Sequence, residues 1–307
     1  MSNWKEVLHE MQDGHKNGDA GSIDRVRRKY LTQLQQYTQR NVIAYYSGWL
    51  QKSGLEGLEI NDDDKNGLMM AIHGLDCSKG LDLILHTPGG DIAATESIVD
   101  YLHRKFPQQN IRAVVPQLAM SAGTMIACAA KTVVMGKHSS LGPIDPQLRG
   151  IPAYGVIHEF KEAHKKIKKD PSALSVWQFI LNKYHPTFLS ECKNAIDLAK
   201  ELVEKTLKAV MFQGERNNNQ KAKKIVKYLS AYLKRKTHGR HINLDECKSI
   251  GLKIVELEHD QTLQDLVLTV HHCYMHTLNH TPAFKIIENH NGAAYIKMEQ
   301  ITNVPHR

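Results

Sequence analysis

Two glycine-bearing turns, each joining a strand to a helix, constrain the fold of this chain more than any other feature. Between residues 81 and 150, short β-branched runs alternate with apolar residues at helical spacing. The strand pattern covers residues 81–86, 111–115 and 131–135, and a helical pattern covers residues 92–106. Strands that alternate with helices predict βαβ units and a largely parallel sheet, so the expected fold class is α/β.

The segments on either side of this region are mostly helical by pattern. Residues 1–39 are polar with spaced apolar side chains, which predicts helix, and residues 41–46 form a β-branched and aromatic run that predicts a strand. Helices are also expected from residue 157 to about 236, and a short capped helix over residues 243–251 ends at a glycine. A last strand is expected over residues 252–257, and the histidine-dotted segment after it has no clear pattern.

The composition is that of an ordinary globular protein. Of its 307 residues, 41% are hydrophobic and 23% are charged, which argues against wholesale disorder. No run of 18 apolar residues is present and the first residues do not resemble a signal peptide, so a cytoplasmic protein without a membrane span is expected. The five cysteines are scattered, which favours reduced thiols over a disulfide framework.

The net charge of +8 raises the question of an acidic partner. Most of the excess lies in the second half of the chain, where lysines and arginines gather between residues 221 and 240. This basic face is a candidate for binding DNA or RNA. Such runs are commonly solvated surface, so both readings stay open.

The two turns leave backbone N–H groups free at helix N-termini, where they can bind a phosphate or a developing oxyanion. The first turn is Pro88-Gly89-Gly90, and the second places Ser121 before the small pair Ala122-Gly123. A serine there has an exposed hydroxyl beside an oxyanion-binding amide, as acyl transfer requires. A serine in such a turn is also commonly a helix cap. Neither turn matches the G-x-G-x-x-G or P-loop patterns, so nucleotide binding is not favoured.

Three motifs resemble the serine dehydrogenase proteinase family, a distant relative of the Clp protease proteolytic subunit and of signal peptide peptidase A. They are L-I-L-H-T-P-G-G-D at 83–91, V-P-Q-L-A-M-S-A-G-T-M-I-A at 115–127 and S-L-G-P-I-D-P-Q at 140–147. Their order and spacing match the family over roughly residues 40–160. A weaker match at Thr237-His238 and residues 242–252 extends the resemblance toward residue 257.

The resemblance implies a Clp protease/crotonase-like spiral of ββα units with additional helices at both ends. It divides the chain into an N-terminal extension of helix and strand (1–65), a catalytic core (66–260) with a helical insertion around residues 157–236, and a C-terminal tail (261–307). It also implies a homo-oligomer. The implied activity is that of a serine peptidase, with a peptide or protein as substrate.

The resemblance further implies a catalytic Ser, Asp and His in that chain order. Carried over residue by residue, Ser121 is the nucleophile, Asp145 the acidic member and His238 the general base, although Gly239 here replaces the aspartate of the family's T-H-D motif. The implied oxyanion-binding groups are the amides of Gly89, Gly90 and Ala122. Asp145 precedes a proline and is equally suited to fixing a turn, and His238 lies in a basic stretch typical of solvated surface.

Three alternatives remain open. A Ser/Lys dyad of the signal peptide peptidase A type would take its base from Lys161, Lys165 or Lys166, although a run this charged is typical of a solvated helix face. The crotonase relatives use equivalent amides to stabilise thioester enolates, but they need no serine at the turn. A third alternative is a nucleic-acid-binding or scaffold protein with a vestigial site.

The histidines suggest two further candidates. His86 directly precedes the first glycine turn, where it either approaches the site or lies satisfied at a strand end. His272 and His276 have the i, i+4 spacing of helical metal ligands, but the glutamate of an H-E-x-x-H motif is missing. No metal and no cofactor are therefore predicted.

Overall fold

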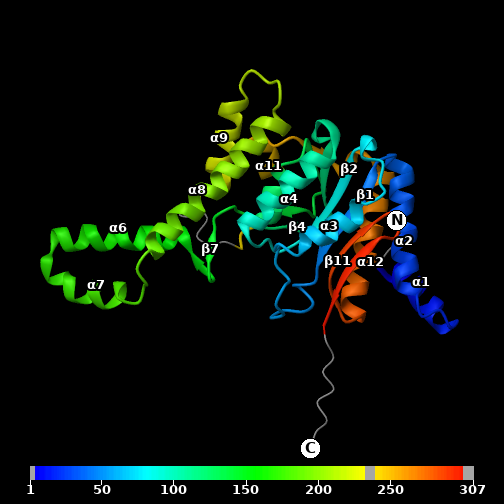
Figure 1. The fold of residues 1–307 in the computed structure, drawn as a ribbon, viewed down its shortest axis with the longest axis horizontal. Coiled ribbons are helices and arrows are strands. Elements are labelled where there is room, and N and C mark those ends of the chain that lie inside the picture. The colour runs from blue at the N-terminus through cyan, green and yellow to red at the C-terminus, as the bar shows by residue number, and fades with distance from the viewer. Residues whose placement is uncertain (1–3, 232–238, 300–307) are drawn as a thin grey trace, which may run out of the picture.

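The computed structural model describes residues 4–231 and 239–299, and its centre is a seven-stranded sheet in the order β10-β5-β3-β2-β1-β11-β12 (Figure 1). The strands are β1 (Asn41–Ser47), β2 (Leu81–His86), β3 (Ile111–Val115), β5 (Thr132–Met135), β10 (Ile254–Glu256), β11 (Ala283–Asn289) and β12 (Ala294–Met298). Strands β10, β5, β3, β2 and β1 run parallel, whereas β11 is antiparallel to β1 and β12 is antiparallel to β11. The prediction of a largely parallel α/β sheet is confirmed.

Helices cover both faces of the sheet, as a parallel sheet requires. Their bounds are α1 (Trp4–Lys16), α2 (Ser22–Thr38), α3 (Asp64–Ile72), α4 (Ile92–Lys105), α5 (Ala122–Cys128), α6 (Ala153–Lys169), α7 (Leu174–Leu181), α8 (Phe188–Thr206), α9 (Asn218–Leu229), α11 (Leu244–Ile250) and α12 (Gln261–His280). A π-helix (Leu207–Met211) continues α8, and single 3-10 turns form at Cys77–Lys79, Pro107–Gln109, Pro171–Ala173 and Leu257–His259.

Alternate side chains of β2 enter two separate cores. Leu83 and Leu85 pack in the larger core, with α4, α5, α8 and α9, while Ile84 packs on the opposite face with α2 and α12. This period of two follows from the pleat of a strand. It places the end of β2 between the two cores, so that consecutive residues there face opposite sides of the sheet.

Two small sheets lie outside the main one. The first has the order β4-β6-β9, formed by Leu118–Ala119, Ser140–Leu141 and Ile242–Asn243, and the second pairs β7 (Gln147–Leu148) with β8 (Ile151–Pro152). The first sheet joins three segments that are far apart in the sequence. It therefore brings the second and third motifs together with the chain that leads into α11.

An arm made of α6, α7 and the start of α8 extends away from the body of the molecule, at the left of Figure 1. It has a small core of its own, in which Val156 of α6 packs with Phe188 and Ile196 of α8. The described part of the segment predicted to be helical, residues 157–231, is mostly helical, in α6, α7, α8, the π-helix and α9. In the described part of the chain, no helix has the length and apolarity that a membrane span needs.

The segments on either side of the central region complete the same sheet. The helix predicted over residues 1–39 is present as α1 and α2, and the predicted cap of α11 is a capping box between Asn243 and Glu246. Between residues 261 and 298, where the sequence has no clear pattern, the chain forms α12, β11 and β12. A buried ion pair of 2.5 Å between Arg27 Nε and Glu288 Oε2 joins α2 to β11.

Candidate active site

The two glycine-bearing turns lie side by side because their backbones are hydrogen-bonded to each other. The Thr87 amide donates to the Leu118 carbonyl (3.1 Å), and the Met120 amide donates to the Thr87 carbonyl (3.0 Å). A Cβ atom placed on Gly89 would lie 2.6 Å from the Cβ of Ser121. Only glycine at position 89 therefore allows the first turn to approach the serine this closely.

The third motif packs against the same serine. A Cβ on Gly142 would lie 2.9 Å from the backbone nitrogen of Ser121. The buried Thr124 hydroxyl accepts from the Gly142 amide (2.9 Å) and lies within hydrogen-bond distance of the Ala119 carbonyl (2.8 Å). Thr124 thus fastens the third motif to the turn that carries Ser121. All three motifs meet at one place.

Ser121 has a strained backbone, with φ of 49° and ψ of −113°. Residues other than glycine rarely adopt this backbone conformation, because it costs them about 1–3 kcal/mol. Within the described residues the side chain makes no capping hydrogen bond to α5, so the interpretation of Ser121 as a helix cap is not supported. A strained serine between a strand and a helix is the arrangement that exposes a nucleophile in serine hydrolases.

Two amides beside Ser121 are placed to bind an anion. The Ile60 amide donates to the Gly89 carbonyl (2.7 Å) and the Asp91 amide donates to the Ile60 carbonyl (2.9 Å), so the intervening Gly90 N–H is directed away from Ile60. Ala122 is the first residue of α5, where an amide has no partner within the helix. Neither amide donates a hydrogen bond to another residue in the described ranges.

Asp145 is buried, with 1% of its surface exposed, beside the end of α9. The preceding Ile144 amide donates to the Leu229 carbonyl (3.1 Å), and the Pro146 carbonyl accepts from Ala153 (3.0 Å). Burial of this carboxyl group differs from the exposed position that is typical of a residue serving only a surface turn. His238, the expected base, lies outside the described residues.

The three candidate lysines of the dyad are exposed on α6, in the arm. Lys165 lies 3.9 Å from Glu162, and the Lys166 ammonium lies 5.5 Å from the ring centroid of Trp177. A lysine acts as a base when burial disfavours its charged form. The structure does not give these lysines such an environment and does not bring them to Ser121.

His86 faces away from Ser121, toward the core formed with α12. It is fully buried, and its ring lies 4.4 Å from that of Trp49 and 5.2 Å from that of His271 between centroids. Neither ring nitrogen has a hydrogen-bond partner among the described residues. Burial lowers the pKa of His86 to about 3, so this imidazole is neutral in the folded protein.

The buried neutral state of His86 predicts a loss of stability in acid. The unfolded chain takes up the proton near pH 6.5, whereas the folded chain does so only near pH 3, so stability falls as the pH is lowered between these values. We expect His86→Phe to reduce the slope of unfolding free energy against pH in this range, by up to about 1.4 kcal/mol per pH unit. Urea unfolding at a series of pH values measures the slope, and equal slopes in the two proteins would contradict the assignment.

His272 and His276 pack against the N-terminal helix. The ring of Trp4 lies 5.4 Å from that of His272 and 4.0 Å from that of His276, and His276 Nε2 contacts the Trp4 carbonyl at 2.9 Å. No group of three metal-ligating side chains occurs in the parts of the chain that the structure describes. The role of this pair in the fold is to hold α1 against α12.

The basic face predicted between residues 221 and 240 is described only in part. Lys221 forms an ion pair of 2.5 Å with Glu215, and the Lys224 ammonium donates to the Ser249 carbonyl at 3.1 Å. These two lysines are engaged within the protein. Binding of nucleic acid to this face stays a prediction.

Sequence reasoning missed a buried network that holds the strand segment beside Gly90. The Asp64 carboxylate accepts from the Tyr45 hydroxyl (2.7 Å), the Lys285 ammonium (2.8 Å) and the Asn61 amide (3.0 Å). Lys285 also donates to the Glu59 carbonyl (2.8 Å). The network therefore fixes residues 59–61, which pair with the glycine turn. Nothing in the sequence around Lys285 signals this partner.

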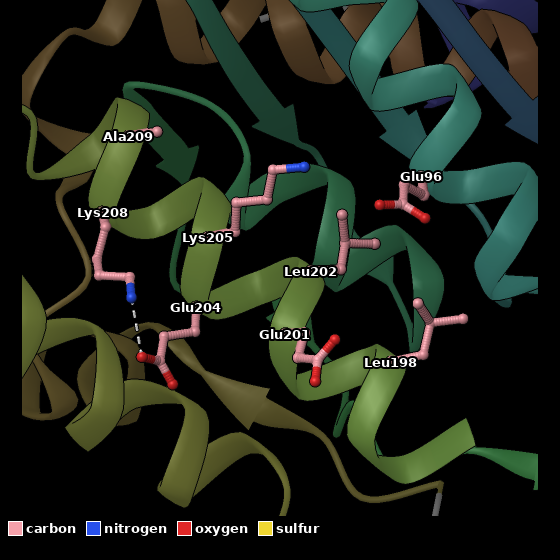
Figure 2. Close-up of a pocket in the computed structure, with 8 residues that line it drawn as sticks. All are labelled: Glu96, Leu198, Glu201, Leu202, Glu204, Lys205, Lys208 and Ala209. Atoms are coloured by element: carbon pink, nitrogen blue, oxygen red, sulfur yellow. Dashed lines mark hydrogen bonds and ion pairs between the residues drawn. The ribbon is translucent and has the colours of Figure 1, made fainter. Parts of the chain in front are cut away.

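A separate cavity of about 560 Å³ lies between α4 and α8 (Figure 2). Glu96 of α4 faces the residues of α8 and the π-helix across it, and Lys208 forms an ion pair of 3.0 Å with Glu204. The lining residues are Glu96, Leu198, Glu201, Leu202, Glu204, Lys205, Lys208 and Ala209. None of the predicted catalytic residues lines this cavity, so it is distinct from the site at Ser121.

Comparison with known proteins decides the family. Residues 23–287 match the family model of the ClpP-like SDH-type serine proteinases. The chain belongs to this family. The match includes all three motifs, and it confirms the resemblance drawn from them. The matched range also includes Ser121 and the glycine turn.

Two curated relatives come from Methanocaldococcus jannaschii. The uncharacterized protein MJ0137 is 31% identical over 195 residues, which cover 64% of this chain and 60% of the relative. The uncharacterized protein MJ1495 is 28% identical over 195 residues, which cover 64% of this chain and 59% of the relative. The chain thus matches about three fifths of the length of each.

Proposed function

We propose that this chain is a serine peptidase that hydrolyses amide bonds through an acyl-enzyme on Ser121. The observation that carries the proposal is the strained Ser121 beside the amides of Gly90 and Ala122. Membership of the ClpP-like SDH-type serine proteinases supports the same chemistry. Together they favour a hydrolase over an enolate-stabilising relative, which has no use for a serine at this turn.

In the proposed reaction, the Ser121 hydroxyl oxygen forms a bond to the carbonyl carbon of the substrate while its proton passes to His238. The amides of Gly90 and Ala122 donate to the resulting oxyanion, with Gly89 giving the turn its close approach. Collapse of the intermediate breaks the C–N bond, and the leaving amine takes the proton from His238. Water then attacks the acyl-enzyme in the same way, which releases the acid and restores Ser121.

The roles of Asp145 and His238 are supported by how the neighbouring chain is attached. Leu229 is hydrogen-bonded to Ile144, and Ile242 pairs with Leu141, so described residues on both sides of His238 contact the third motif. His238 precedes Ile242 by four residues, so their Cα atoms are at most about 14 Å apart. In the proposed triad, the buried Asp145 orients the imidazole and stabilises its cation.

The proposed substrate is a peptide bound in extended form along the glycine turn. Ile60 occupies one edge of the Gly89-Gly90 backbone as a bridge partner, and the Gly90 N–H points to the other edge. A peptide added there would pair as an extra strand, which is β-augmentation. The spiral of ββα units and a homo-oligomeric assembly belong to the same proposal and rest on the family resemblance.

Substitution of Asp145 and His238 distinguishes a Ser/Asp/His triad from a Ser/Lys dyad. We expect Asp145→Asn and His238→Ala each to lower turnover of a peptide library by at least about 10³-fold, because the serine loses its base or the base its orientation. Lys166→Ala is the matched control on α6 and should leave turnover within about twofold, since exposed side chains away from the site contribute little. Mass spectrometry of the cleaved peptides measures all four proteins.

The opposite pattern would favour the dyad. Turnover that survives His238→Ala but is lost with Lys166→Ala would contradict the triad and keep the nucleophile. Circular dichroism and thermal unfolding of each variant show whether a loss of turnover comes from a loss of fold.

A further inference from the structure

The helix at the end of the arm exposes an apolar surface. None of the eight residues of α7 is charged and none is buried. Leu174, Val176 and Phe179 are 52%, 63% and 70% exposed, respectively. Val176 and Phe179 are three residues apart and therefore lie on the same face of α7. An exposed apolar face of this kind marks an interaction site.

Lysines surround this helix on both sides. Between residues 161 and 183 there are six lysines and two carboxylates, a formal net charge of +4. The lysine ammonium groups lie beside the aromatic rings of the helix: Lys166 is 5.5 Å from the centroid of Trp177, and Lys183 is 5.3 Å from that of Phe179. The positive charge and the apolar side chains therefore share one surface, which we call the arm tip (residues 165–183).

We propose that the arm tip binds the surface of an anionic lipid bilayer. Exposed aliphatic and aromatic side chains enter the boundary between headgroups and acyl chains, while flanking lysines remain among the negative headgroups. The arm extends away from the sheet, and α7 lies near its outer end (Figure 1). The site is peripheral and involves no membrane span.

The charge favours a bilayer over a second copy of the chain. Pairing α7 with its counterpart would bring two tips of like charge together, whereas an anionic surface neutralises the lysines. The apolar residues in turn favour lipid over nucleic acid, since phosphate contacts alone would not use Val176 and Phe179. The inference does not rest on the proposed peptidase activity, because Ser121 takes no part in it.

Co-sedimentation of the full chain with vesicles tests the proposal. We expect binding to phosphatidylcholine vesicles that contain phosphatidylserine and much weaker binding to phosphatidylcholine alone. Val176→Ser with Phe179→Ser should weaken binding by at least about tenfold, because the variant loses the burial of two large apolar side chains. Lys168→Glu with Lys169→Glu should remove the preference for phosphatidylserine.

The matched control is Met69→Ser with Met70→Ser, which removes two exposed apolar side chains of α3, 50% and 46% exposed, away from the arm. This control should bind vesicles as the unaltered chain does. No binding at low salt would overturn the proposal. Equal binding by the Val176→Ser, Phe179→Ser variant and by the Met69→Ser, Met70→Ser control would also overturn it. A dimer in solution that Phe179→Ser dissociates, without vesicle binding, would assign the surface to a second copy instead. The Ser121→Ala chain should bind vesicles as the unaltered chain does. A failure of the peptidase proposal can therefore be distinguished from a failure of the membrane proposal.

Discussion

Replacing Ser121 with glycine is expected to stabilise the protein while abolishing its activity. The φ of 49° and ψ of −113° at this residue suit glycine, so the substitution removes strain of about 1–3 kcal/mol. Glycine also gives the unfolded chain more conformational freedom, which reduces this gain in stability by about 0.5–1 kcal/mol. The free energy of unfolding should therefore rise by about 1 kcal/mol, and peptide turnover should fall by at least about 10⁴-fold.

Ser121→Ala is the matched control, because alanine loses the hydroxyl but keeps the strain. It should be as inactive as the glycine variant and no more stable than the unaltered protein. Urea unfolding of the three proteins measures the difference. Equal stability of the glycine and alanine variants would show that the backbone at residue 121 is not strained, and would remove the main structural argument for a nucleophile.

Gly90→Ala is expected to disrupt the site from the opposite side. A Cβ at this position would overlap the backbone nitrogen and oxygen of Ile60, so the bridge between Ile60 and Gly90 has to open. Two buried backbone hydrogen bonds are lost with it, which predicts a loss of about 3 kcal/mol in the free energy of unfolding. Turnover should fall to background, because the amide that binds the oxyanion moves with the turn.

Gly54→Ala separates this collision from a general effect of replacing a turn glycine. Gly54 has a φ of +89°, and a Cβ there would meet no atom within 4 Å. Its substitution should cost about 1 kcal/mol from backbone strain alone and should leave turnover intact. Thermal unfolding and peptide turnover compare the two variants. Similar losses from both would mean that Ile60 does not support the glycine turn.

The parallel strands and the two turns were predictable because their signals are local. Strands β2, β3 and β5 are short β-branched runs that stand out against the helices between them. Gly89 and Ser121 are conspicuous because each lies in a run of small residues directly after a strand. Their proximity also follows from the sequence, since the ends of adjacent parallel strands meet at one edge of a sheet.

The C-terminal elements were not predictable from the same kind of signal. Helix α12 buries His271, His276 and two threonines among its apolar residues, so the apolar residues alone do not show a clear helical period. Strand β11 carries Lys285 and Glu288 inside the protein, where each is neutralised by a partner far away in the sequence. Because charged residues are mostly exposed, the sequence predicts surface positions for Lys285 and Glu288 unless their partners are known.

The sequence predicted the two turns of the candidate site, but not the residues that hold these turns in place. Ile60 contributes only backbone hydrogen bonds to the glycine turn, and any residue can supply these. Thr124 and Gly142 depend on the fold bringing residues 118–124 and 140–142 together. The roles of Asp145 and His238 came from the family resemblance rather than from a local pattern, and they stay predictions.

The most direct test of the account is reaction of the full chain with a fluorophosphonate, followed by mass spectrometry of the modified peptide. A strained serine beside two free amides should react in the folded protein and form the adduct on Ser121 alone. Protein unfolded in urea should not react, because the geometry that activates the hydroxyl is then lost. Absence of an adduct from the folded chain, or an adduct on a different serine, would contradict the assignment of Ser121 as the nucleophile.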